Sequence, residues 1–177
     1  SQLDGNAQHM RMAAAMLLTL PGQPFVYYGE ELGMRGKKPD PDLREPMRWH
    51  RDPHGAGETR WKTFSAGDGP DVSVEAEQQA GDSLLHYYAM LIGWRREVGA
   101  LRDGTLTAPP LANPHIAAWR LDDAGSHVLV LHNLSGQSQQ VPPGDTRFRH
   151  VLRHSRAGTA LQRGRLTLPP YASATLD

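Results

Sequence analysis

The hydrophobic pattern predicts two helices in the first half of the chain. Residues 7–20 are rich in Ala, Met and Leu and follow Asn6, a residue type that caps helix N-termini. This segment is apolar on most sides, so we expect a helix that is buried on more than one face. Over 83–98 apolar residues recur at helical spacing, and we expect a helix there that Asp82 caps and Gly99 ends.

A short apolar run lies between these helices. Phe25 to Tyr28 are four consecutive apolar or aromatic residues, a run too short to assign by periodicity alone. The flanking Pro24 and Gly29 favour a buried strand that delivers a loop at its C-terminal end. From about residue 30 to 79 no period is sustained, and a loop of this length inside a compact domain is either functional or partly disordered.

The pattern changes after Gly104. Short runs rich in β-branched residues and leucine alternate with turn signals, and His127 to Leu131 reads HVLVL. Such spacing favours an antiparallel sandwich with Greek-key connections. The strands are expected over residues 115–121, 127–133, 137–141, 148–154, 165–168 and 172–176. The chain therefore divides into an α/β part, residues 1–99, and an all-β part, residues 100–177.

Three motifs resemble the α-amylase family of glycoside hydrolases, family 13. GQPFVYYGEELGM is similar to the segment that leaves the family's eighth barrel strand, and PDLREPMRW is similar to the segment that follows it. LLHYYAMLIGWRREVGALRDG is similar to the last barrel helix and the step into the C-terminal β domain. The motifs occur in the family's order, and the resemblance covers most of residues 6–105.

This resemblance implies a (β/α)8 barrel followed by a β domain. A complete barrel needs roughly 200 to 250 residues. The chain has 177 residues and spends its last third on β structure, so it cannot hold the whole barrel. We therefore expect residues 1–99 to be the C-terminal fragment of a (β/α)8 TIM barrel and residues 100–177 to be an antiparallel β-sandwich.

The resemblance also implies a reaction. A retaining glycosidase uses two carboxyl groups about 5 to 5.5 Å apart, and in this family they follow the fourth and fifth barrel strands, with a third Asp near the seventh. None of the motifs for these three residues occurs here in its expected setting. We expect a parent enzyme that hydrolyses α-glucosidic bonds of malto- or isomalto-oligosaccharides or α-glucans, and a chain that is inactive alone. The alternatives are a transglycosidase parent, of the trehalose synthase or amylosucrase type, and a non-catalytic carbohydrate-binding or interaction module.

Arg44 is the candidate substrate-binding residue. A guanidinium group can donate two parallel hydrogen bonds to a carboxylate or to sugar hydroxyls. In oligo-1,6-glucosidase-like relatives the matching arginine lies at the glycone end of the cleft. The alternative is a solvated loop arginine that pairs with Asp42 or Glu45.

Four further residues are expected to anchor the loop: Tyr28, Gly29, Glu31 and Trp49. Glu31 is expected to do so through a salt bridge or hydrogen bonds. Trp49 and Trp61 could stack on sugars, although packing within the loop is favoured. Core packing is likewise favoured for Tyr27 and Tyr28.

Composition limits the classes of partner that we expect. Nineteen acidic and nineteen basic residues balance, which gives no electrostatic reason to expect nucleic acid or an anionic membrane. The sequence has no cysteine and no spaced ligand set, so neither a metal nor a cofactor is expected. No signal-peptide pattern is present, which favours the cytoplasm without choosing a compartment. The incomplete barrel is expected to favour self-association.

Overall fold

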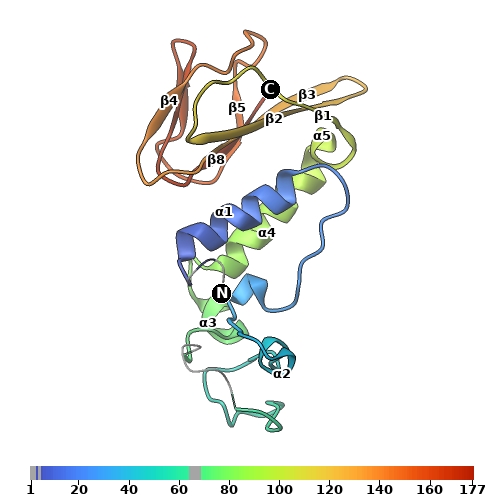
Figure 1. The fold of residues 1–177 in the computed structure, drawn as a ribbon, viewed down its shortest axis with the longest axis vertical. Helices are drawn as coiled ribbons and strands as arrows, with labels where there is room; N and C mark the ends of the chain where they lie inside the picture. The colour runs from blue at the N-terminus through green and yellow to red at the C-terminus, as the bar shows by residue number, and fades with distance from the viewer. Residues whose placement is uncertain (1–2, 4, 64–68) are drawn as a thin grey trace. The chain divides into compact units, whose positions relative to one another are not determined.

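The computed structural model describes residues 3, 5–63 and 69–177 (Figure 1). It forms two compact units, one made of Ser1–Arg11 with Phe25–Met90 and the other of Met12–Pro24 with Leu91–Asp177. Two helices, α1 (Ala7–Thr19) and α4 (Leu84–Glu97), contribute residues to both units. The domain boundary after residue 99 stays a prediction.

The second unit contains two antiparallel sheets. The larger has the strand order β1-β2-β3-β8-β5 and the smaller β4-β7-β6. Six of the eight strands were expected from the sequence, whereas the short β1 and β6 were not. The strands are β1 (Thr105–Thr107), β2 (Ile116–Asp123), β3 (Ser126–Asn133), β4 (Gln139–Val141), β5 (Val151–His154), β6 (Ala160–Gln162), β7 (Arg165–Leu168) and β8 (Ser173–Leu176).

The core of this unit lies between the sheets. Leu129 and Leu131 of β3, Leu166 and Leu168 of β7 and Leu176 of β8 belong to one buried cluster. Residues of both sheets therefore share one apolar layer, as in a β-sandwich. The predicted α/β plus all-β fold class is confirmed, with the sandwich built as expected.

The opposite face of β3 is also buried, and it carries a histidine. His132 is fully buried, with its Nδ1 2.8 Å from Ser173 Oγ and its Nε2 3.1 Å from Thr19 Oγ1. The Thr19 hydroxyl donates to the Ala15 carbonyl at 2.6 Å, so it accepts from His132, and Nε2 carries the ring proton. Trp119 completes the group, because its indole Nε1 donates to the Thr19 carbonyl at 3.0 Å. These bonds satisfy the end of α1 within this unit.

Arg95 of α4 holds the chain that follows α1. Its guanidinium donates to the Leu18 carbonyl at 3.2 Å, to the Leu20 carbonyl at 2.8 Å, and to the Gly22 carbonyl. The side chain is buried, which lowers the pKa of Arg95, although the nearby Asp103 opposes this shift. A cation at the last carbonyls of a helix satisfies groups that the helix itself leaves unpaired.

The first unit consists mainly of loops joined by short helices. They are the 3₁₀ helix η1 (Glu30–Leu32), α2 (Asp40–Leu43) and α3 (Val74–Gln79), none of which was expected. The predicted Asn6 cap is confirmed, since its Oδ1 accepts from Gln8 N at 2.9 Å and His9 N at 3.2 Å. Ser83, rather than Asp82, caps α4 by accepting from His86 N at 3.0 Å. Asp82 instead pairs with Arg11 at 2.8 Å.

Two local expectations were wrong, the strand at Phe25 to Tyr28 and the core packing of its two tyrosines. Phe25 to Tyr28 form no strand with any other described segment, and Phe25 is 82% exposed. A strand needs a neighbour to complete its backbone hydrogen bonds, and a local run cannot supply one. For the same reason Tyr27 and Tyr28 are exposed rather than packed in a core. The helix α4 ends at Glu97, close to the expected end before Gly99, and Gly99 then begins the further short helix α5 (Gly99–Asp103). None of the described helices is long and apolar enough to cross a membrane.

Candidate functional site

A tight turn follows the exposed aromatic run. Gly29 has φ 86° and Gly33 φ 73°, and the Met34 amide closes the turn by donating to the Gly29 carbonyl at 2.9 Å. A Cβ on Gly29 would collide with the Met34 side chain. Both the left-handed backbone and the close approach therefore require glycine at position 29.

Two tyrosines hold this turn against its surroundings. The Tyr28 hydroxyl donates to the Glu45 carbonyl at 3.0 Å, and the Tyr88 hydroxyl of α4 lies 3.5 Å from Glu30 Oε2. Partial desolvation of its hydroxyl group and the neighbouring Tyr27 raise the pKa of Tyr28. Burial and the Glu30 carboxylate raise the pKa of Tyr88. Both hydroxyls therefore remain protonated donors at neutral pH.

Glu31 and Arg44 occupy different environments. Glu31 Oε2 is buried and has no hydrogen-bond partner among the described residues. The Arg44 side chain is 70% exposed and lies 3.2 Å from Asp40 Oδ2, one helical turn earlier in sequence. The sequence offered Asp42 or Glu45 as its partner, but Asp42 pairs with Lys62 instead. An ion pair this exposed contributes little to stability, so the guanidinium is available to other groups.

Trp49 is fixed through its backbone and exposed through its side chain. Its amide donates to Glu58 Oε1 at 2.8 Å, and its carbonyl accepts from the Glu75 amide at 2.9 Å. The residue is nevertheless 51% exposed. Packing of the Trp49 and Trp61 rings, which the sequence favoured, is therefore wrong, since Trp61 is 65% exposed.

Two carboxylates hold the residues that follow Trp49. Glu58, only 9% exposed, also accepts from the His50 amide at 2.5 Å, and Glu75 Oε2 accepts from the Arg51 amide at 2.9 Å. The backbone of residues 49–51 is thus bonded at four successive points, which gives the exposed indole a defined position. The second oxygen of Glu58 is buried without a hydrogen-bond partner among the described residues.

A cavity of about 680 Å³ opens beside the Trp49 side chain. His50 Nδ1 lies 3.7 Å from Glu75 Oε2 at its wall. Volumes of this order suit small-molecule ligands. The cavity is lined by Trp49, His50, Ala56, Gly57, Val74, Glu75 and Gln78.

The lining has the chemistry of a sugar site. An aromatic face covers the apolar C–H face of a pyranose, and amide and carboxylate groups bond its hydroxyls. The described part of the chain holds no cluster of three or more His, Asp or Glu side chains that could bind a metal ion. The aromatic ring and the polar side chains of the cavity can together contact a polar ring.

Two family models match this chain. The model described as "Alpha amylase, catalytic domain" matches residues 1–104, and "Alpha-amylase SusG C-terminal domain" matches residues 116–174. The chain belongs to the α-amylase family. Within this family, residues 25–62, which carry Trp49 and Arg44, fall inside the catalytic-domain match, whereas the β-sandwich carries the second match.

The named relatives are longer enzymes. Alpha-amylase SusG of Bacteroides thetaiotaomicron is 37% identical over 82% of the chain and 22% of its own length. Alpha-amylase 3 of Dictyoglomus thermophilum is 33% identical over 74% of the chain and 26% of its own length. The crystal structure of the alpha-amylase from H. orenii has a TM-score of 0.80 and 33% identity, over 99% of the chain and 36% of that protein. The chain thus spans about a quarter to a third of these α-amylase-family members.

Other family members bear the names of transferring enzymes. The 4-alpha-glucanotransferase of Thermotoga neapolitana is 32% identical over 72% of the chain and 30% of its own length. The trehalose synthase of Thermus thermophilus is 32% identical over 77% of the chain and 16% of its own length. The family therefore includes both glycosidases and transglycosylases at similar identity to this chain.

The sequence singled out Trp49 as a loop anchor and Arg44 as a substrate-binding candidate. The structure places both at the surface of the first unit, but of the two only Trp49 lines the cavity. The role of Arg44 stays a prediction. Glu58, Glu75 and Gln78 were missed. Their signal is weak, because Glu58 follows a Gly-rich turn and the other two lie on a polar six-residue helix. Only the fold brings them beside Trp49.

Proposed function

We propose that residues 25–90 carry part of the sugar-binding cleft of an enzyme that hydrolyses or transfers α-glucosidic bonds. The observation that carries this proposal is the exposed, backbone-fixed Trp49 beside Glu75 and Gln78 in a cavity of about 680 Å³. This platform lies within the segment that matches the family's catalytic domain. The relatives' names, alpha-amylase and 4-alpha-glucanotransferase, support an α-glucan or malto-oligosaccharide as the ligand.

The chemical step is proposed to depend on carboxylates outside this chain. The two carboxylates nearest the cavity are already engaged, because Glu58 Oε1 accepts two amides and Glu75 Oε2 accepts one. A retaining mechanism needs one free nucleophile and one proton donor about 5 to 5.5 Å apart. Glu58 and Glu75 are therefore proposed to position Trp49 and His50, and the chain alone is proposed to bind but not to cleave. A retaining mechanism in the parent enzyme rests on the family resemblance.

A transferring parent enzyme is the second candidate. The observation in its favour is the pair of relatives named 4-alpha-glucanotransferase and trehalose synthase, which match this chain about as well as the alpha-amylases do. An aromatic platform can hold an acceptor sugar as well as a substrate. Transfer in the parent enzyme would then depend on how well such sites retain the acceptor in place of water.

A maltotriose titration of the chain, followed by its amide and indole NMR signals, tests the proposal. We expect millimolar binding, with shifts at residues 48–58 and 74–78, and no release of glucose. Trp49→Ala should weaken binding by about tenfold, because loss of an aromatic platform removes roughly 1 to 1.5 kcal/mol of contact. Trp61→Ala is the matched control, since Trp61 is also an exposed tryptophan but does not line the cavity. Equal binding by both variants and the wild type would contradict the proposal.

A further inference from the structure

A second cavity, of about 480 Å³, lies entirely within the β-sandwich unit. It runs between the β4–β5 connection and the tip of the β6–β7 hairpin. Its apolar surface comes from Pro142, Pro143, Phe148 and Leu161, and its polar surface from Asp145, Thr146, Arg149 and Arg163. Neither the Trp49 cavity nor the match to the catalytic domain includes any of these residues.

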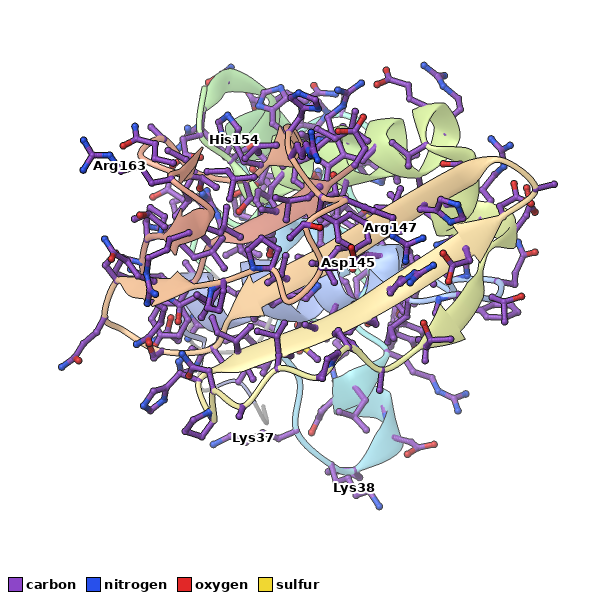
Figure 2. All side chains as sticks on the ribbon, turned by 90° about the horizontal axis from the view of Figure 1, so that it is seen from above. Lys37, Lys38, Asp145, Arg147, His154 and Arg163 are labelled. Atoms are coloured by element: carbon purple, nitrogen blue, oxygen red, sulfur yellow. The ribbon has the colours of Figure 1, made fainter. Side chains whose placement is uncertain are left out.

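The segment around this groove is strongly basic although the whole chain is neutral. Residues 142–165 contain six arginines and one acidic residue, Asp145. Asp145 is already neutralised, because Arg147 donates to its Oδ2 from Nε at 2.9 Å and from Nη2 at 2.7 Å. Arg120 Nη1 lies 3.8 Å from the same oxygen, and these bonds lower the pKa of Asp145 to about 2. Figure 2 shows Asp145 and Arg147 next to each other.

The two arginines of the groove are not neutralised in this way. Arg149 donates through Nε to the Thr146 carbonyl at 3.1 Å, and no carboxylate of a described residue lies within ion-pair distance of it. Arg163 likewise has no ion pair with a described residue, and Figure 2 shows its side chain extending outward from the ribbon. Both residues are exposed. The groove therefore presents two guanidinium groups without counterions in the protein.

The backbone conformation at Arg163 is unfavourable for a residue other than glycine. Arg163 has φ 49° and Gly164 φ 71°, so both central residues of the β6–β7 turn are left-handed. Turns of this kind favour Asn-Gly, because a side chain with a Cβ is disfavoured at positive φ. An arginine that occupies such a position at the rim of a cavity is a reason to look for a role in binding.

We propose that this groove binds a small sugar that carries an anionic group, with the ring on the Pro142 and Leu161 surface and the anion between Arg149 and Arg163. Guanidinium groups form paired, charge-assisted hydrogen bonds with phosphate and carboxylate oxygens. The apolar floor covers the C–H face of a ring, which a bare anion does not need. This site is independent of the function proposed for the Trp49 cavity.

Titration of the chain with glucose 6-phosphate, glucose and inorganic phosphate tests this proposal. We expect glucose 6-phosphate to bind at least about fivefold more tightly than either of the other two, because it alone offers both groups. Added salt should weaken the binding, since the arginines are exposed. NMR shifts should fall on residues 142–149 and 161–164. Equal binding of inorganic phosphate would overturn the role of the apolar floor, and equal binding of glucose would overturn the role of the arginines.

Arg163→Asn separates binding from folding. Asparagine tolerates positive φ better than arginine, so the variant should keep or slightly raise the melting temperature. It should nevertheless weaken glucose 6-phosphate binding by about tenfold. Arg165→Gln is the matched control, because Arg165 lies on the same hairpin, is exposed and does not line the groove. Unchanged affinity in Arg163→Asn, or equal loss in the control, would overturn the proposal.

Discussion

The two units of this protein distribute their apolar and polar groups in opposite ways. In the sandwich unit the leucines of β3, β7 and β8 are fully buried, and even the buried His132 has a hydrogen-bond partner at each ring nitrogen. In the first unit several aromatic residues of the loop, among them Phe25, Trp49 and Trp61, are at the surface. Glu31 and Glu58 there each bury an oxygen without a hydrogen-bond partner among the described residues. A closed core gives stability, whereas exposed rings on a fixed backbone give a binding surface.

The largest effect should come from the core of the sandwich. Leu131→Ala removes a fully buried side chain between the two sheets and should lower the free energy of unfolding by about 3 to 4 kcal/mol. Phe25→Ser, which changes a residue that is 82% exposed, should leave it within about 0.5 kcal/mol. Urea denaturation of both variants measures the contrast. Comparable losses would mean that stability is not concentrated in the sandwich.

Arg95→Ala should have the next largest effect on the free energy of unfolding. The substitution leaves the carbonyls of Leu18, Leu20 and Gly22 without their donor and should destabilise the chain by about 2 to 4 kcal/mol. Arg96→Ala, at the exposed neighbour, is the control and should cost less than about 1 kcal/mol. Thermal unfolding of the two variants decides whether the buried guanidinium holds the end of α1.

Acid should weaken the sandwich through His132. Burial lowers the pKa of His132 to about 3 from its ordinary 6.5. Between these values the unfolded chain binds a proton that the folded chain does not, so stability is complete above the unfolded pKa and decreases by roughly 1.4 kcal/mol per pH unit below it.

Denaturation at pH 7 and pH 5 measures this dependence. The wild type should lose about 2 kcal/mol more than His132→Gln between the two values. His154→Gln, at an exposed histidine, should behave as the wild type does. If the stability of His132→Gln fell with pH as steeply as that of the wild type, the pH dependence could not come from His132.

Replacing Glu58 should affect stability less than the changes above, but it should also weaken sugar binding. Glu58→Ala removes the acceptor of the Trp49 and His50 amides and should cost about 1 to 2 kcal/mol. Because the indole then loses its fixed position, maltotriose affinity should fall several-fold although no lining residue has changed. Glu77→Ala, on the same unit but away from the cavity lining, should keep the affinity.

Arg44 should matter least for folding. Its ion pair with Asp40 is exposed on both sides, so Arg44→Ala should change the free energy of unfolding by less than about 0.5 kcal/mol. In the parent enzyme that contains these residues we expect the same change to raise KM for maltotriose at least tenfold, because a two-bond sugar contact is lost. An unchanged KM would remove Arg44 from the substrate cleft.

Local signals predicted those parts of the fold that depend on nearby residues. The Asn6 cap, the helix α4 and the apolar strand β3 follow from side chains within a few positions. The paired strand expected at Phe25–Tyr28 could not be judged this way, because its hydrogen bonds depend on a distant segment.

The candidate site follows the same rule. The family motif contains Trp49, but Glu58 and Glu75 reach Trp49 across nine and twenty-six positions of the chain. The burial of His132 could not be predicted either, since its partners Thr19 and Ser173 come from opposite ends of the sequence. Contacts between residues this far apart become visible only in the folded chain.

Amide hydrogen exchange with and without maltotriose tests the contrast between the two units most directly. The amides of β3 and β8 should exchange slowest and should not respond to the sugar, because the sandwich core is closed. The amides of residues 49–51, which Glu58 and Glu75 hold, should gain protection when maltotriose binds at Trp49. Protection that appears on the sandwich instead, or that is absent from residues 49–51 at saturating sugar, would contradict the account.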